Sequence, residues 1–131
     1  MKGMILAAGL GERLLPLTLS VPKPLVPILG RPLIDRAVEA LRRAGATDLL
    51  VNLHHLPDRL REELGDGASR GVRVAWSFEP RILGPVGGVR NALDFFGDEP
   101  FVVWNGDILA DLDLAAMVRD HEDRARASTT K

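Results

Sequence analysis

The residues best suited to chemistry near the amino end are two glycines and two isolated cations. Gly9–Gly11, a Gly-Leu-Gly turn, directly follows a short apolar run, and glycine lets backbone N–H groups approach a phosphate closely. Arg13 follows the turn, and Lys23 lies between Pro22 and Pro24. Because proline restricts its own φ and the residue before it, the spacing predicts an extended, stiff segment on which Lys23 and Arg13 form a phosphate clamp. A tight turn with two solvated cations remains the alternative on spacing alone.

The best-known phosphate-binding loops do not fit this stretch. A dinucleotide fingerprint needs a third glycine where this sequence has Leu14, and a long helix that the prolines between Pro16 and Pro27 forbid. A Walker A loop needs a Gly-Lys-Ser/Thr triplet, which the chain lacks. Any phosphate contacts therefore have to come from a glycine turn followed by proline-rich chain.

A carboxylate far along the chain could hold a metal ion. Asp107 follows the apolar run 101–104 and an Asn-Gly pair at 105–106. A carboxylate at the end of a buried strand can bind a hard cation beyond the sheet, although Asn-Gly-Asp is also a common turn sequence. Asp111 and Asp113 are better explained as the start of a helix than as a metal-binding pair.

Strands and helices are predicted to alternate along the chain and to position these residues. Apolar or alternating runs predict strands at 4–8, 48–53, 72–78 and 101–104. Helical spacing of apolar residues predicts helices at 32–44, 57–64, 87–96 and 114–127. This alternation is typical of an α/β fold with a doubly wound, mainly parallel sheet, whose ligands bind beyond the carboxyl ends of the strands. We therefore predict one unit over residues 1–131, with its site in the loops after Ala8, Leu53, Phe78 and Trp104.

Composition limits the class of protein. The 131 residues are 46% hydrophobic and 27% charged, which suits a globular domain. The formal net charge is −1, so we expect no nucleic-acid partner. The absence of cysteine excludes disulfides, thiolate zinc sites and a cysteine nucleophile. The first apolar run is too short for a signal peptide or a membrane span, so we expect a cytoplasmic protein without a membrane partner.

Two motifs resemble the signature of the sugar-1-phosphate nucleotidylyltransferases, which have a Rossmann-like nucleotidyltransferase fold. They are Leu-Ala-Ala-Gly-Leu-Gly-Glu-Arg-Leu-Leu-Pro-Leu-Thr at 6–18 and Pro-Lys-Pro-Leu at 22–25, at the separation expected of the family. With Glu12 at this position, the first motif resembles that of the N-acetylmuramate-1-phosphate uridylyltransferase branch. The mannose-1-phosphate guanylyltransferases are also similar. The resemblance implies an enzyme for which an NTP (UTP or GTP) and a sugar 1-phosphate are the substrates, and an NDP-sugar and pyrophosphate the products.

The resemblance also implies roles for individual residues. Arg13 and Lys23 are the implied catalytic residues, and Asp107 is the implied ligand of Mg²⁺. The sugar is expected to face Asn105 and Gly88. The implied nucleotide-binding positions are Leu6, Ala8, Gly9, Gly11, Glu12, Arg13 and Lys23.

Two features depart from the family pattern or stay outside it. The loop at 83–88, Leu-Gly-Pro-Val-Gly-Gly, differs from the usual Leu-Gly-Thr-Ala-Gly. Pro85 removes an N–H and replaces a hydroxyl, which weakens the expectation of base or sugar contacts there. We interpret Asn52, His54 and His55 as capping or surface residues rather than metal ligands.

The resemblance covers nearly all of this chain but only about the first half of the family's catalytic domain, or somewhat more. It therefore predicts a truncated domain. The strand at 101–104 would then lack a neighbour, and its open apolar edge predicts pairing with a second copy. A non-catalytic nucleotide-binding or interaction module that kept the fold is the alternative to an enzyme.

Overall fold

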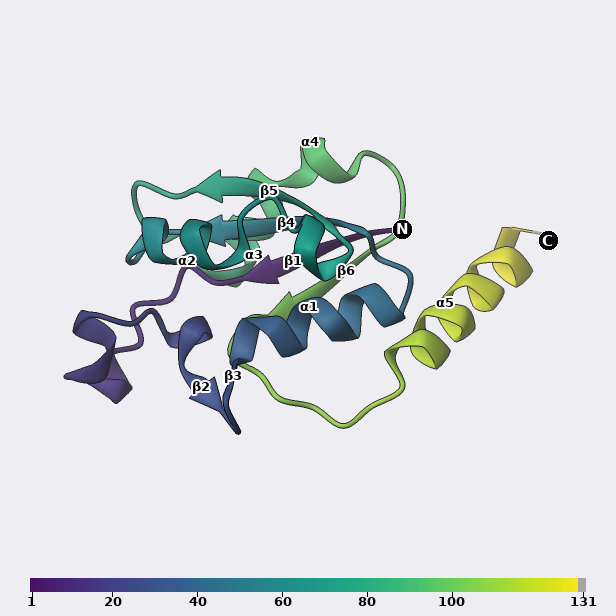
Figure 1. Cartoon of the computed structure of the whole chain (residues 1–131). Helices are drawn as coiled ribbons and strands as arrows, with labels where there is room; N and C mark the ends of the chain where they lie inside the picture. Colours follow the sequence, from purple (N-terminus) through teal and green to yellow (C-terminus); the bar gives the residue numbers. More distant parts are fainter. Residues whose placement is uncertain (130–131) are drawn as a thin grey trace.

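The computed structural model describes residues 1–129 and is built on a parallel sheet of four strands in the order β5-β4-β1-β6 (Figure 1). The predicted doubly wound α/β fold is confirmed. No helix in these residues is long and apolar enough to cross a bilayer. The strands are β1 (Lys2–Leu6), β4 (Asp48–Leu53), β5 (Arg73–Phe78) and β6 (Phe101–Asn105).

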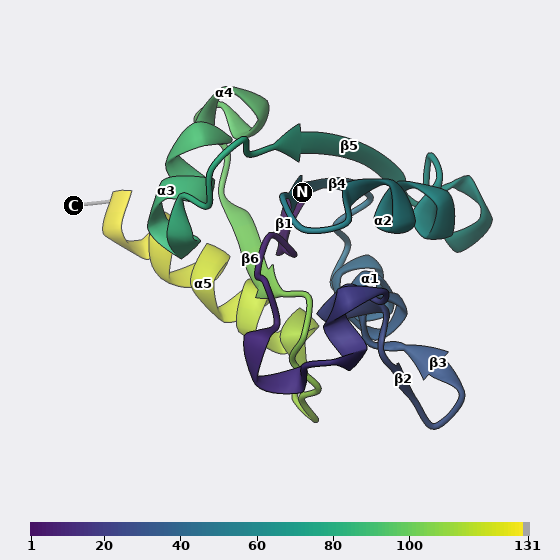
Figure 2. The same cartoon turned by 90° about the vertical axis from the view of Figure 1, so that its left-hand side faces the viewer.

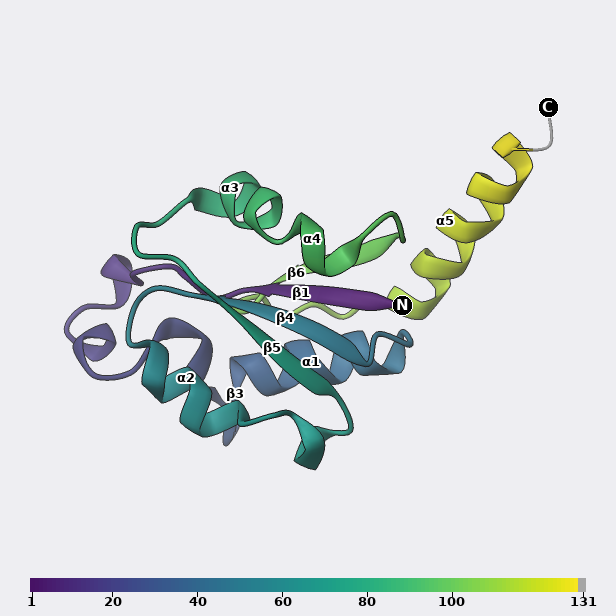
Figure 3. The same cartoon turned by 90° about the horizontal axis from the view of Figure 1, so that it is seen from above.

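Helices cover both faces of the sheet. Helices α1 (Leu33–Arg43) and α2 (Pro57–Leu64) lie on one face, and α3 (Gly84–Asn91) and α4 (Leu93–Phe96) lie on the other (Figure 3). Helix α5 (Leu114–Thr129) contacts α1 near its start and then extends away from the body of the molecule. A short 3₁₀ turn, η4 (Ala68–Arg70), connects α2 to β5.

The central strand β1 is buried on both faces because both carry helices. Successive side chains of a strand point to opposite faces. Met4 accordingly packs with Phe96 on the α4 side, whereas Ile5 packs with Ile34 and Leu41 of α1. Burial of each such side chain contributes about 1.5–3 kcal/mol, so apolar packing fixes the layers.

The segment between β1 and α1 differs from the extended stretch that its prolines predict. It forms three single 3₁₀ turns, η1 (Glu12–Leu14), η2 (Leu17–Leu19) and η3 (Lys23–Leu25). A hairpin of β2 (Pro27–Ile28) and β3 (Arg31–Pro32) follows and leads into α1 (Figure 2).

The prediction was wrong at Lys23 because the residue opens η3 instead of lying in extended chain. Pro22, directly before it, is extended, with ψ 142°. Pro24 occupies the first turn of η3, where a helix does not need the missing N–H.

Two other boundaries move for identifiable reasons. The first strand ends at Leu6 rather than at position 8, because the N–H of Ala7 donates to the Asn52 side chain instead of to a neighbouring strand. The helix predicted at 87–96 starts earlier and divides at Ala92 into α3 and α4. Leu93, the first residue after this break, is 47% exposed.

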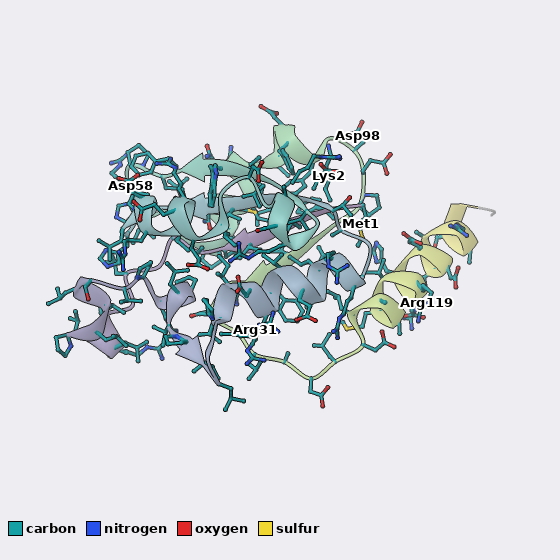
Figure 4. All side chains as sticks on the ribbon, in the orientation of Figure 1. Met1, Lys2, Arg31, Asp58, Asp98 and Arg119 are labelled. Carbon is teal, nitrogen blue, oxygen red and sulfur yellow. The ribbon has the colours of Figure 1, made fainter. Side chains whose placement is uncertain are left out.

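Charged side chains are distributed over separate elements of the surface (Figure 4). Asp58 on α2, Asp98 after α4 and Arg119 on α5 are all exposed. This distribution agrees with the nearly balanced charge of the sequence.

Candidate functional site

The candidate site lies where the parallel strands end. Leu6 at the end of β1 is in register with Asn52 on β4 and with Asn105 on β6, so three neighbouring strands reach the same edge. Figure 2 looks onto this edge, with the purple segment that carries the 3₁₀ turns and helix α3 on different sides of β1. A pocket of about 270 Å³ opens there. It is lined by Leu6, Ala7, Ala8, Gly9, Lys23, Pro24, Asn52, Glu79, Ile82, Gly84, Pro85, Asn105 and Asp107.

Lys23 and Asp107 meet in this pocket. Lys23 Nζ lies 2.5 Å from Asp107 Oδ2, and their side chains are 27% and 31% exposed. Lys23 is held there because its neighbours Pro22 and Pro24 are buried. The structure thus brings together the cation and the carboxylate that the sequence singled out from distant parts of the chain.

Gly106 positions Asp107. Its N–H donates to the carbonyl of Leu6 at 2.9 Å. A Cβ atom at position 106 would lie 3.0 Å from a methyl carbon of Ile5 and 3.1 Å from the Leu6 carbonyl oxygen. The chain can leave β6 this close to β1 only with glycine, and this exit turns Asp107 into the pocket.

The glycine turn is held in place by hydrogen bonds from residues outside the pocket lining. Gly11 has φ +67°, a left-handed conformation that favours glycine. Its carbonyl accepts a hydrogen bond of 2.9 Å from the hydroxyl of Thr18, which is fully buried. His55 Nε2 in turn donates to the Thr18 carbonyl at 2.5 Å. His54 likewise donates through Nδ1 to the carbonyl of Glu79 at 2.7 Å, so both histidines support loops.

Not all predicted residues line the pocket. Leu6, Ala8, Gly9, Lys23, Asn105 and Asp107 do, whereas Gly11, Glu12, Arg13 and Gly88 do not. Arg13 lies on η1, just after the left-handed residue Gly11, and is not part of the pocket lining. Its side chain is exposed and forms no ion pair with any other described residue. Arg13 therefore does not join Lys23 in the pocket wall, and its contact with phosphate stays a prediction.

Two polar residues of the site were not predicted to have a role there. Asn52 and Glu79 are 3% and 1% exposed, and they form a buried hydrogen bond of 2.8 Å from Asn52 Nδ2 to Glu79 Oε1. Asn52 lies on β4 rather than at the surface, and Glu79 comes directly after β5. Their position at the carboxyl ends of predicted strands was the available signal.

Gly88 belongs with this buried pair. It is a buried residue of α3, and a Cβ atom there would lie 2.9 Å from Asn52 Nδ2 and 3.0 Å from Glu79 Oε1. The space that the glycine leaves is thus filled by Asn52 and Glu79. Gly84 and Pro85 belong to the same loop at 83–88, which differs from the family pattern, and they line the pocket instead.

The donor set of the pocket fits a magnesium ion that is shared with a substrate. The described residues contain no group of three or more His, Cys, Asp or Glu side chains placed to hold a metal. The pocket wall contains two carboxylates. Glu79 is buried and bonded to Asn52, whereas Asp107 is partly exposed, and Asn105 also lines the pocket. Mg²⁺ usually keeps one or two carboxylates and takes its other ligands from phosphates and water, so one carboxylate suffices.

Comparisons with known proteins show the family of this chain. The sequence model of the family described as "Nucleotidyl transferase" matches residues 2–131. N-acetylmuramate alpha-1-phosphate uridylyltransferase of Neisseria meningitidis is 46% identical over 88% of this chain and 51% of its own length. Mannose-1-phosphate guanyltransferase beta-B of Xenopus laevis is 39% identical over 98% of this chain and 37% of its own length.

A solved structure shows the same fold. The crystal structure of a putative glucose-1-phosphate thymidylyltransferase from Bacillus anthracis, in complex with a sucrose, matches with a TM-score of 0.88 and 31% identity. The match covers 94% of this chain and 50% of that chain. The chain therefore belongs to the nucleotidyl transferase family, and the relatives that it resembles are sugar-1-phosphate nucleotidylyltransferases, as its motifs predict. It spans about half the length of the Neisseria relative.

Proposed function

We propose that this chain binds a nucleoside triphosphate and contributes to joining it with a sugar 1-phosphate, with an NDP-sugar and pyrophosphate as products. The observation that carries the proposal is the convergence of Lys23, Asp107 and the first residues of the glycine loop on one pocket. A glycine backbone, a compact ammonium and a carboxylate for a divalent cation form a set suited to a triphosphate.

The reaction demands positioning more than covalent chemistry. An oxygen of the sugar phosphate attacks the α-phosphorus, a new P–O bond forms, and the bond to pyrophosphate breaks in line with the attack. Lys23 would contact the α-phosphate. The backbone of Gly9–Gly11, with Arg13, would bind the departing β- and γ-phosphates. Asp107 would hold Mg²⁺, which neutralises phosphate charge when bound.

UTP and GTP are the proposed nucleotides. The similarity to a uridylyltransferase and to a guanyltransferase supports both. Gly84 and Pro85 lie in the pocket wall and are candidates to contact the base or the sugar. Because Pro85 has no N–H to donate, base selection in this loop would have to use other groups.

Binding is tested by isothermal titration and thermal shift of the whole chain with UTP, GTP, dTTP and ATP, each with and without Mg²⁺. We expect UTP or GTP to stabilise the chain, and more so with Mg²⁺. No binding of any nucleotide would overturn the proposal.

Turnover is tested by pyrophosphate release with N-acetylmuramate 1-phosphate or mannose 1-phosphate as the second substrate. We expect Lys23→Ala to lower the turnover number more than the affinity for the sugar phosphate, and an unchanged turnover number would contradict its role. Binding without turnover in the unaltered chain would favour the non-catalytic nucleotide-binding module.

A further inference from the structure

We propose that the buried Asn52–Glu79 pair is a positioning unit that holds the two walls of the nucleotide pocket at a fixed separation. The inference rests on the proposed function and adds two residues to it. Both residues line the pocket, but only 3% of Asn52 and 1% of Glu79 are exposed, because their polar groups bond to each other and to backbone N–H groups. Their effect would pass through the backbone groups that they hold.

The pair connects two loops that are far apart in sequence. On one side, the N–H of Ala7 donates to Asn52 Oδ1 at 2.7 Å. On the other, the N–H of Leu83 donates to Glu79 Oε2 at 3.0 Å. Ala7 immediately precedes the glycine loop, and Leu83 is the residue from which α3 begins. The pair therefore joins the wall that approaches phosphate to the wall formed by Gly84 and Pro85.

Counting donors and acceptors shows why the pair combines an amide with a carboxylate. Ala7 and Leu83 both present N–H donors, so both ends of the pair must be acceptors, and its two members must also satisfy each other. One amide and one carboxylate meet all three requirements. With two amides, either two N–H₂ groups would face each other or one backbone N–H would have no acceptor. With two carboxylates, two acceptors would face each other and no donor would lie between them.

The site gives this arrangement further support. The Glu79 carboxylate lies at the start of α3, where the partial positive charge of the helix favours an anion. Only glycine at position 88 leaves room for the pair, since a Cβ there would approach both Asn52 Nδ2 and Glu79 Oε1 within 3.0 Å. A buried donor left without its acceptor is costly, so the chain has little freedom to replace one member alone.

The test exchanges the two chemical types. Glu79→Gln and Asn52→Asp each break the count of donors and acceptors. The double variant Asn52→Asp/Glu79→Gln restores it, because the carboxylate now at position 52 would accept from the Ala7 N–H and from the amide now at position 79. The oxygen of that amide would in turn accept from the Leu83 N–H. Asn91→Asp and Glu62→Gln make the same chemical changes at exposed positions of α3 and α2 and serve as controls.

Three quantities are measured for each folded variant: the melting temperature, hydrogen exchange of the Ala7 and Leu83 amides, and the Kd for UTP and GTP with Mg²⁺. We expect each single variant to lower the melting temperature by several degrees, to expose at least one of the two amides, and to weaken nucleotide binding by about tenfold. The double variant should regain most of all three, and the two controls should match the unaltered chain.

The possible failures are distinguishable. Nucleotide affinity equal to that of the unaltered chain in both single variants, with only the melting temperature lowered, would reduce the pair to a structural role. Failure of the double variant to recover, whether in folding or in binding, would overturn the donor–acceptor argument even if a single variant does not fold. An unaltered chain that binds no nucleotide would refute the proposed function, and the positioning role with it.

Discussion

Lys23 Nζ and Asp107 Oδ2 are 2.5 Å apart, so the two opposite charges that the proposed function requires are each other's partners. A phosphate would have to attract Lys23 away from this contact, and a divalent cation would have to attract Asp107. A phosphate bound to Lys23 frees Asp107 for the cation, and a cation bound to Asp107 frees Lys23 for the phosphate. Binding of nucleotide and of cation should therefore be positively coupled.

Replacing Lys23 should have opposite effects on the two ligands. In Lys23→Met the carboxylate of Asp107 has no ammonium beside it, so Mn²⁺ alone should bind more tightly than to the unaltered chain. Nucleotide affinity should fall by about tenfold to a hundredfold, as expected for loss of a charged hydrogen bond. Titration calorimetry with Mn²⁺ and then with UTP or GTP measures both.

Lys2→Met serves as the control for Lys23→Met, and Lys23→Met itself should cost little stability. Lys2→Met removes an ammonium at the opposite end of β1 and should leave both affinities unchanged. Since a part-exposed ion pair contributes only about 0–1 kcal/mol, Lys23→Met should unfold within a few degrees of the unaltered chain. Weaker Mn²⁺ binding in Lys23→Met would contradict the competition.

Arg13 should contribute to nucleotide affinity without contributing to stability. Its side chain is exposed and has no ion-pair partner among the described residues. Arg13→Ala should therefore weaken nucleotide binding by about threefold to thirtyfold while the melting temperature stays within about 1–2 °C. Arg59→Ala, an exposed arginine on α2, is the matched control. An Arg13→Ala chain that binds UTP and GTP as tightly as the Arg59→Ala chain would remove Arg13 from the proposed site.

Gly11 should tolerate no side chain unless Thr18 also changes. A Cβ at position 11 would lie 2.7 Å from Thr18 Cγ2, in a backbone with φ +67°. Gly11→Ala should lower the free energy of unfolding by about 1–3 kcal/mol through this contact and the left-handed strain. Thr18→Ser deletes the methyl group and keeps the hydroxyl. Chemical denaturation should show partial recovery in Gly11→Ala/Thr18→Ser, and a double variant no more stable than Gly11→Ala would show that backbone strain alone sets the cost.

The outer edge of β6 is a candidate contact between two copies. In the described residues, β6 pairs only with β1, and Val103 on it is 40% exposed. An open apolar edge favours strand pairing, and lysine on it opposes pairing. Light scattering should show association of the unaltered chain at high concentration, and Val103→Lys should abolish it. Leu29→Lys, at the exposed tip of the β2–β3 hairpin, should not. A monomeric unaltered chain at every concentration would exclude the contact.

Periodicity predicted the strands and most helices because burial on two faces leaves continuous apolar runs such as that around Met4 and Ile5. The ends of elements were less predictable because side chains decided them. Asn52 takes the N–H of Ala7 out of the sheet, and no local pattern contains this long-range bond. The structure of the proline-rich segment was also missed, since Pro24 can open a 3₁₀ turn as readily as it can follow extended chain.

For the site, motif spacing identified Lys23 and Asp107, and the sheet topology explains their meeting. Parallel strands deliver the loops after β1 and β6 to one edge whatever their separation in sequence. Arg13 could not be placed in the same way, because its direction depends on the single left-handed residue Gly11. Glu79 escaped notice because an acidic residue after a strand looks like an ordinary turn residue until its buried partner is known.

The alignment of Asn52, Leu6 and Asn105 in one row across the sheet restricts where the length of this chain can change. Inserting or deleting a single residue within β4 or β6 would turn the asparagine to the opposite face and bring an apolar neighbour into the row. Length changes should therefore not be tolerated inside these strands, whereas the tip of the β2–β3 hairpin, where Leu29 is 89% exposed, should accept them.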